Sequence, residues 1–221
     1  DDVLGPNKLQ IQIKLLQEFE AGMVYCLYSC IDTDSNPLDN KESIRFDTRK
    51  VKNVKFRKLV NKYDIGLLTP IIRKSVLDEN GIIFSDKSEF SSDYYFFLQV
   101  ASNTKIIREN KVLCYYRIHD ASLTKKIKYA TKARECQSML IDKSLKFSIR
   151  DHKIFFKVER IRKKYFLLHD SVSRADINLL RNVSWAWPIN RFSHLKYLAL
   201  SIMPKKVIRF MLVKINKRSH E

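Results

Sequence analysis

The sequence has no apolar run of about 18 residues, the length that a helix needs to cross a bilayer, and no signal peptide. Its four cysteines, Cys26, Cys30, Cys114 and Cys136, show no paired spacing of the kind that binds a metal. Three of them lie in apolar, strand-like runs, so we expect reduced thiols in the core of an intracellular protein. No motif for reading nucleic-acid bases is present.

Acidic residues are scarce in the second part of the chain. Residues 1–124 contain 18 Lys and Arg against 17 Asp and Glu, a net charge of +1. Residues 125–221 contain 24 against 7, a net charge of +17, and therefore hold nearly all of the +18 of the whole chain. This change in composition predicts two domains, with a boundary near Thr124.

One stretch, residues 89–101, joins a polar lead-in to a strongly apolar run, with Asp93 between them. The aromatic and aliphatic side chains that follow cannot all face water, so we predict a buried helix whose first turn Ser91 or Ser92 caps. The positive end of the helix dipole favours an ionised carboxylate at Asp93, where it could serve as a base. A purely stabilising acidic residue in a first turn fits the same pattern.

The rest of the first part alternates helices and strands. We predict a helix over residues 7–20, with Leu9, Ile13 and Leu16 on one stripe, and a buried strand over residues 23–31. Asp32 to Pro37 have the composition of a turn, so the acids at 32 and 34 are attributed to it and not to a metal site. We further predict a short helix over residues 52–62 and a strand over residues 65–73. Two more strands, residues 104–108 and 111–118, are predicted to be joined by a tight turn at residues 109–110.

Polar residues suited to phosphate chemistry stand at both ends of this part. Asp1 and Asp2 are adjacent carboxylates that a hard divalent cation could use, although an acidic helix lead-in fits them too. Arg117 could bind phosphate oxygens in pairs, and a neutral His119 could complete the shell of a cation. Judged alone, His119 also fits a capping or surface histidine.

Taken in order, residues 1–12, 65–74, 89–101 and 115–124 resemble the family 2 glycosyltransferases of the GT-A fold, in the bacterial branch that builds surface polysaccharides. The resemblance covers residues 1–124. It implies an α/β fold: the C-terminal portion of a Rossmann-like mixed sheet flanked by helices, followed by a basic α-helical extension. The nucleotide-binding half that precedes Asp1 and Asp2 in this family is absent, so we expect the chain to be a fragment that could be inactive alone.

The resemblance also implies a reaction and the residues that perform it. An inverting transferase would move a sugar from a nucleoside-diphosphate sugar to a hydroxyl of a surface glycan or lipid-linked acceptor. Asp93 would be the base, Asp1, Asp2 and His119 would hold Mg²⁺ or Mn²⁺, and Arg117, Thr69, Arg73 and Ser92 would bind substrate. Ser92 departs from the family, in which an acidic residue usually precedes the catalytic aspartate.

The extension of residues 125–221 predicts amphipathic helices that carry many lysines and arginines and two tryptophans, Trp185 and Trp187. Such helices fit an anionic bilayer surface, which would place the protein in the cytoplasm, peripheral on the inner face of the cell membrane. A helical cap with a solvated basic face fits equally well. The competing function is a non-enzymatic basic adaptor for membrane or nucleic acid, with no specific nucleic-acid partner predicted.

Overall fold

The structure of the chain, a computed structural model, describes residues 1–38, 51–88, 90–119, 128–174, 176, 178–180, 182, 199, 201–204 and 207. The chain forms two compact units. Residues 1–125 and 142–155 make up the first unit, and residues 126–141 and 156–221 make up the second. The segment 142–155 therefore returns to the first unit, while the predicted division into domains 1–124 and 125–221 stays a prediction.

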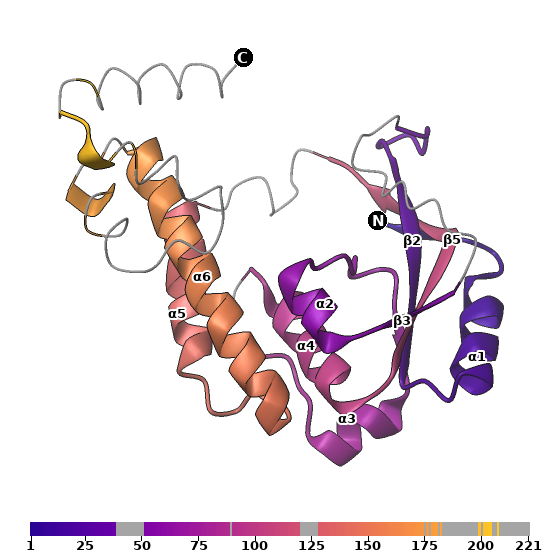
Figure 1. Ribbon diagram of the computed structural model, residues 1–221. Helices are drawn as coiled ribbons and strands as arrows, with labels where there is room; N and C mark the ends of the chain where they lie inside the picture. Colours follow the sequence, from indigo (N-terminus) through magenta and orange to yellow (C-terminus); the bar gives the residue numbers. More distant parts are fainter. Residues whose placement is uncertain are drawn as a thin grey trace. The chain divides into compact units, whose positions relative to one another are not determined.

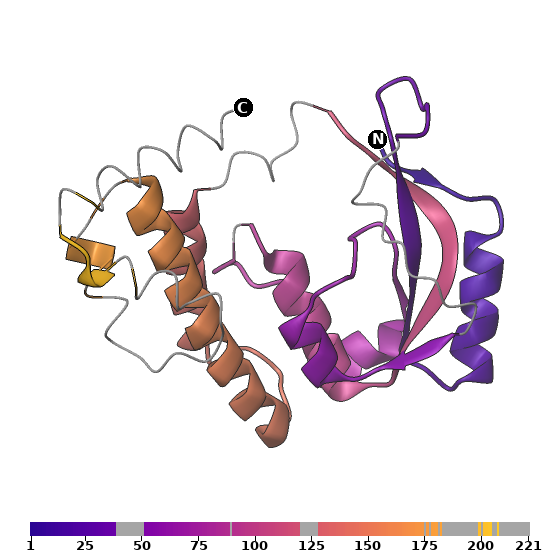
Figure 2. The ribbon, with the colours of Figure 1, turned by 45° about the horizontal axis from the view of Figure 1, so that its top comes forward.

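The first unit is a mixed sheet with helices on both faces (Figure 1). Its strands are β1 (Val3–Leu4), β2 (Met23–Ile31), β3 (Lys52–Val54), β4 (Ile71–Ile72) and β5 (Ile106–Arg117), and its helices are α1 (Lys8–Glu18), α2 (Phe56–Asn61), α3 (Lys74–Asn80) and α4 (Ser92–Asn103). The strand order is β1-β5-β2-β4, and β3 also pairs with β5. Helix α1 covers one face, and α2 and α4 lie on the other (Figures 1 and 2). The predicted fold class is confirmed.

The parallel pair β2 and β5 forms the centre of the sheet, and the other strand pairs are antiparallel. The first three residues of β2, Met23, Val24 and Tyr25, have no exposed surface, as expected for a strand that is covered on both faces. The predicted strand over residues 23–31 is confirmed. The predicted buried helix is confirmed as well, since every residue of α4 from Tyr94 to Val100 is buried.

Helix α1 confirms the predicted helix near residues 7–20, but the predicted buried stripe is right at Leu16 and wrong at Leu9 and Ile13. Leu9 and Ile13 are 54% and 48% exposed, and the buried face consists of Lys8, Gln12, Leu15 and Leu16. The cause is a polar anchor, because the amide of Gln12 donates to the backbone carbonyls of Val24 and Thr69 at 3.1 and 2.9 Å. Apolar periodicity alone could not locate a face that a buried glutamine helps to fix.

The last predicted strand pair is also wrong, because residues 106–117 form the single strand β5. Its register with β2 shifts between the pairs Tyr25–Arg108 and Leu27–Val112, so the polar residues 109 and 110 lie in an irregularity and not in a reversing turn. Arg108 is buried and donates to the side chain of Asn110 at 3.0 Å, which satisfies polar groups inside the strand.

Two shorter predicted elements needed new boundaries. Residues 52–62 contain β3 and α2 in place of one helix, although Val54, Leu59 and Val60 are buried as predicted. Within residues 65–73 only β4 is a strand, because Thr69 donates its side-chain hydroxyl and its backbone N–H to the carbonyl of Gly66 and closes a turn.

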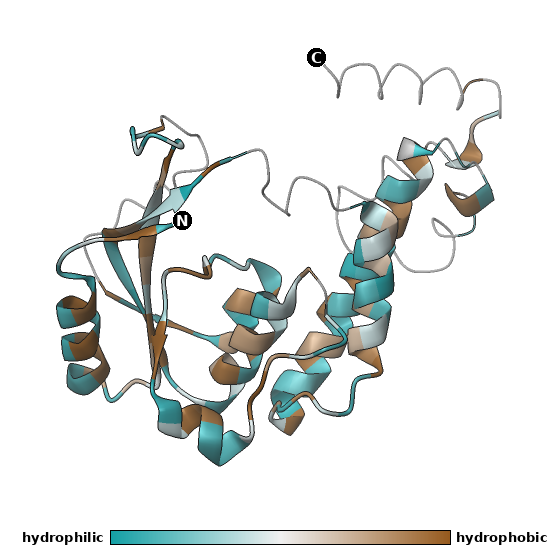
Figure 3. Ribbon diagram, turned by 180° about the vertical axis from the view of Figure 1, so that it is seen from behind, coloured by the Kyte–Doolittle hydropathy of each residue, from teal (hydrophilic) through white to brown (hydrophobic). Residues whose placement is uncertain are grey.

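The second unit contains α5 (Tyr129–Leu140) and the part of α6 (Ile149–Ser173) that follows residue 155. The ring of Tyr129 stacks on that of His169 at 4.8 Å, and Lys163 donates to the side chain of Gln137. The start of α5 thus faces the later part of α6, and the two helices run antiparallel. No helix among the described residues has the length and apolar character needed to cross a membrane, and Figure 3 shows hydrophilic bands along α6.

Most residues of the predicted extension that follow Ser173, including both tryptophans, lie outside the described residues.

Candidate functional site

Three segments that are distant in the sequence meet at one edge of the sheet, where the parallel strands β2 and β5 end. Ile31, the last residue of β2, pairs with Arg117, the last residue of β5. Strand β1 runs antiparallel along β5, with Val3 opposite Tyr115, so the residues before it reach the same edge. Ligands of open α/β sheets bind beyond the carboxyl ends of the strands, which makes this edge a candidate site.

Asp1 and His119 contact each other directly at this edge. The Oδ2 atom of Asp1 lies 2.8 Å from Nε2 of His119, and the two side chains are 57% and 33% exposed. A carboxylate and an imidazole that face each other and remain open to solvent are suited to a cation or a phosphate complex. The structure thus brings together two of the three predicted metal ligands.

Asp2 and Arg117 also belong to this edge, but they hold protein groups. Oδ1 of Asp2 accepts the backbone N–H of Arg117 at 2.9 Å. The guanidinium of Arg117 donates from Nε to the carbonyl of Asp1 and from Nη1 to the carbonyls of Asp32 and Thr33, at 2.7 to 2.8 Å. Its Nη2 donates to the hydroxyl of Ser35 at 3.1 Å. Four of its five N–H donors are engaged, so in this arrangement Arg117 ties the edge together.

The turn after β2 is built by the side chain of Asp32. Its Oδ1 accepts the backbone N–H groups of Asp34 and Asn36 at 2.9 and 2.8 Å, and its Oδ2 accepts the side-chain amide of Asn36. These bonds, with the one from the Asn36 amide foremost, lower the pKa of the Asp32 carboxyl. The assignment of Asp32 and Asp34 to a turn is confirmed, and Arg117 locks this turn against the first residues of the chain.

No three His, Cys, Asp or Glu side chains in the described part of the chain gather closely enough to form a metal cluster. Mg²⁺ bound to a nucleotide usually takes only one or two protein carboxylates, and the phosphates and water supply the other ligands. The facing oxygen and nitrogen of Asp1 and His119 fit such a sparse set. Asp2, whose Oδ1 accepts a backbone N–H, would need to turn to join them.

Asp93 lies in the first turn of α4, as predicted, with Ser91 at the N-cap position and Ser92 as the first helical residue. The side chain of Ser91 makes no capping hydrogen bond, so the predicted serine cap is not formed at the N-cap residue. The hydroxyl of Tyr63 donates instead to Oδ2 of Asp93 at 3.0 Å. Neither Tyr63 nor this bond was anticipated, because a tyrosine 30 positions away carries no local signal.

Thr69 and Arg73, two of the predicted substrate-binding residues, both bind groups of the protein itself. Thr69 is fully buried, and Arg73 donates to the carbonyls of Leu16 and Ala21 at 2.9 Å, near the end of α1. Ile72 pairs with Met23 at the start of β2, whereas Arg117 pairs with Ile31 at its end. A strand of nine residues spans about 26 Å, so Arg73 lies near the opposite end of the sheet. A role in substrate binding stays a prediction for both.

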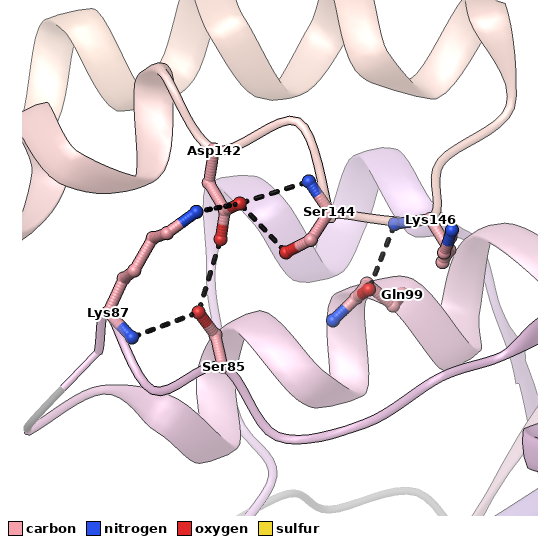
Figure 4. A network of polar contacts seen from close by, with 6 residues as sticks. All are labelled: Ser85, Lys87, Gln99, Asp142, Ser144 and Lys146. Carbon is pink, nitrogen blue, oxygen red and sulfur yellow. Dashed lines mark hydrogen bonds and ion pairs between the residues drawn. The ribbon is translucent and has the colours of Figure 1, made fainter.

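A polar network holds the loop that precedes α4 (Figure 4). The carboxylate of Asp142 accepts the ammonium of Lys87 at 2.8 Å, the hydroxyl of Ser85 at 3.1 Å, and the backbone N–H and hydroxyl of Ser144 at 3.0 and 2.7 Å. Gln99, within α4, accepts the backbone N–H of Lys146 at 2.9 Å. Residues 142–155, assigned to the basic extension from composition, therefore fix the loop and helix that carry Asp93.

Comparison with known proteins supports the fold and gives no family. No family model matches the sequence, and no curated protein matches it. The structure is similar to crystal structures of S. aureus TarS, a glycosyltransferase. TarS 1–349 in complex with UDP-GlcNAc matches with a TM-score of 0.52 and 15% identity over 85% of this chain and 56% of the other. A second crystal structure of TarS 1–349 matches with a TM-score of 0.50 and 14% identity, over 85% of this chain and 54% of the other. This chain thus spans about half the length of those structures, and the likeness shows a GT-A-like glycosyltransferase fold.

Proposed function

We propose that this chain is part of an inverting, family 2 glycosyltransferase that transfers a sugar from a nucleoside-diphosphate sugar to a hydroxyl of a surface glycan or lipid-linked acceptor. The observation that carries the proposal is the fold shared with TarS, which was crystallised with UDP-GlcNAc. The direct contact of Asp1 with His119 and the position of Asp93 at the start of α4 give that fold groups suited to the reaction.

The proposed reaction is a single displacement at the anomeric carbon. The acceptor hydroxyl attacks that carbon while its proton passes to the carboxylate of Asp93, and the bond from carbon to the diphosphate oxygen breaks. The diphosphate leaves with the electron pair of that bond. Attack from the face opposite to the leaving group inverts the anomeric configuration.

Departure of the diphosphate concentrates negative charge beside the carboxyl ends of β2 and β5. Mg²⁺ or Mn²⁺ would supply a Lewis acid for that charge, with Asp1 and His119 as protein ligands and Asp2 as a third if it turns. Arg117 holds Asp1, Asp2 and the turn after β2 together, since it donates to the carbonyl of Asp1, the carboxylate of Asp2 and the carbonyl of Asp32. Among the described residues the fifth N–H of its guanidinium has no acceptor, and it could reach a phosphate.

We also propose that residues 125–221 hold the protein on an anionic membrane at the cytoplasmic face. The support is their net charge of +17, since each basic residue near such a surface adds about 1 kcal/mol of binding energy. A membrane-bound acceptor would then be presented to the first unit at high local concentration.

The test is the release of nucleoside diphosphate from a panel of nucleotide sugars that includes UDP-GlcNAc, with Mn²⁺ or with a chelator. We expect slow hydrolysis or transfer with at least one donor, lost when the cation is removed. Because this chain spans about half of TarS 1–349, the assay uses the longest natural protein that contains the sequence. Failure of every nucleotide sugar to bind would favour the non-enzymatic adaptor.

A further inference from the structure

Asp93, the proposed base, accepts a hydrogen bond from Tyr63, a residue that lies outside α4. Tyr63 follows α2, and its hydroxyl donates to Oδ2 of Asp93 at 3.0 Å. Its ring packs edge-on against that of Tyr94, the next residue of α4, at 5.1 Å between centroids. Tyr63 therefore contacts the side chains of two successive residues of the first turn of α4, the carboxylate of Asp93 and the ring of Tyr94.

The residue after Tyr63 is anchored in the sheet. Asp64 forms a buried ion pair with Arg108 of β5, with Oδ2 and Nη1 2.9 Å apart and side chains that are 6% and 1% exposed. Its other oxygen accepts the hydroxyl of Tyr25 of β2 at 2.9 Å. A buried pair with this many bonds cannot shift without exposing an uncompensated charge, so it holds the backbone of residues 63 and 64 on β2 and β5.

The chemistry of Tyr63 makes it a permanent donor. Burial, and after it the negative charge of Asp93, raise the pKa of the Tyr63 hydroxyl far above its usual value, and Tyr94 and Asp64 add to the shift. The hydroxyl therefore keeps its proton at neutral pH and can donate it to Asp93, as it does in this structure. Burial likewise raises the pKa of Tyr25, so both hydroxyls stay protonated.

We propose that Tyr63 is a positioning residue that aims the carboxylate of Asp93 by holding Oδ2, which turns Oδ1 to the acceptor hydroxyl. This inference rests on the proposed function for the role of Asp93, whereas the hydrogen bond from Tyr63 to Asp93 is a feature of the structure. The ion pair of Asp64 with Arg108 fixes the position of the Tyr63 hydroxyl relative to the sheet. Tyr63 thus connects the sheet, through the neighbouring Asp64–Arg108 ion pair, to the carboxylate of Asp93.

The test is Tyr63→Phe, which removes the hydroxyl and keeps the ring that packs on Tyr94. We expect kcat to fall by about 10- to 100-fold with the KM for the nucleotide sugar unchanged, as a misaimed catalytic group produces. A second readout is independent of turnover: the side-chain carboxyl ¹³C resonance of Asp93, assigned by its loss in Asp93→Asn, should shift in Tyr63→Phe.

Ser171→Ala is the matched control, because it deletes a buried hydroxyl that donates within α6, to the carbonyl of Leu168 at 2.7 Å, and takes no part in holding Tyr63. It should lower stability to a similar extent and leave the Asp93 resonance in place. An unmoved Asp93 resonance in Tyr63→Phe would overturn the inference, and so would a moved resonance with an unchanged kcat. If the wild type turns over no donor, the proposed function fails, and the resonance alone decides whether Tyr63 positions Asp93.

Discussion

Oδ2 of Asp1 lies 2.8 Å from Nε2 of His119, although the two residues stand at opposite ends of the segment that forms the sheet. The contact arises because β1 runs antiparallel along the end of β5, and Arg117 donates to the carbonyl of Asp1 from that end. A carboxylate and an imidazole are thereby held together at the carboxyl edge of the sheet, where the proposed reaction requires the charge of the diphosphate to be neutralised.

This contact predicts a cation requirement that depends on both partners. His119→Ala should raise the Mn²⁺ concentration that gives half-maximal transfer by about tenfold or more, because removal of even an outer-shell partner costs that much. The measurement is a Mn²⁺ titration of donor turnover. His152→Ala is the control, since His152 lies in α6 and contacts Phe147. An unchanged Mn²⁺ dependence in His119→Ala would remove His119 from the metal site.

The network around Asp142 predicts how stability depends on pH. Burial raises the pKa of the Asp142 carboxyl, but the bonds from Lys87, Ser144 and Ser85 lower it more, to about 2. A carboxyl with a depressed pKa stabilises the fold above its unfolded pKa of about 3.9, and this contribution is lost as the pH falls to about 2. Asp142→Asn should therefore lower the free energy of unfolding by about 1 to 3 kcal/mol at neutral pH.

The measurement for Asp142→Asn is urea unfolding at a series of pH values. The difference from the wild type should narrow between about pH 4 and pH 2. Asp78→Asn serves as the control, because Asp78 pairs with Lys74 in the open, with side chains that are 59% and 85% exposed, and such a pair contributes little. A difference that stays constant down to pH 2 would contradict the assigned role of the Asp142 charge.

The basic extension predicts electrostatic binding to membranes. The protein should sediment with vesicles that contain anionic lipid and be released as salt shortens the Debye length to about 3 Å, near 1 M. Vesicles of neutral lipid supply the comparison. Equal sedimentation with both kinds of vesicle would show that charge does not drive binding, and equal affinity for a nucleic-acid duplex would favour the adaptor.

The sequence predicted the central elements of the fold because their signals are local. The run from Met23 to Ile31 is apolar enough for a strand covered on both faces, and the stretch around Asp93 has one polar end and one buried end. The resemblance to family 2 glycosyltransferases grouped the two aspartates with His119, and the pairing of β1 with β5 brings Asp1 to His119.

The features that the sequence did not predict depend on long-range polar contacts. Gln12 turns α1 to an unexpected face, and Arg108 keeps β5 continuous through a polar pair that resembles a turn. Tyr63 reaches Asp93, and Asp142 reaches Lys87, across 30 and 55 positions. A contact between side chains so distant in the sequence produces no periodic pattern of residues. The composition was therefore the only guide to Asp142, and it placed this residue in the extension.

The most direct test of the account is Asp93→Asn in the transfer reaction. The amide keeps the size of the carboxylate and cannot take the acceptor's proton, so transfer should fall by at least about 100-fold while the affinity for the nucleotide sugar stays unchanged. Asp86→Asn, in the exposed loop before α4, should leave both quantities as they are. Transfer retained in Asp93→Asn would contradict the account, because no base would then be assigned to the reaction.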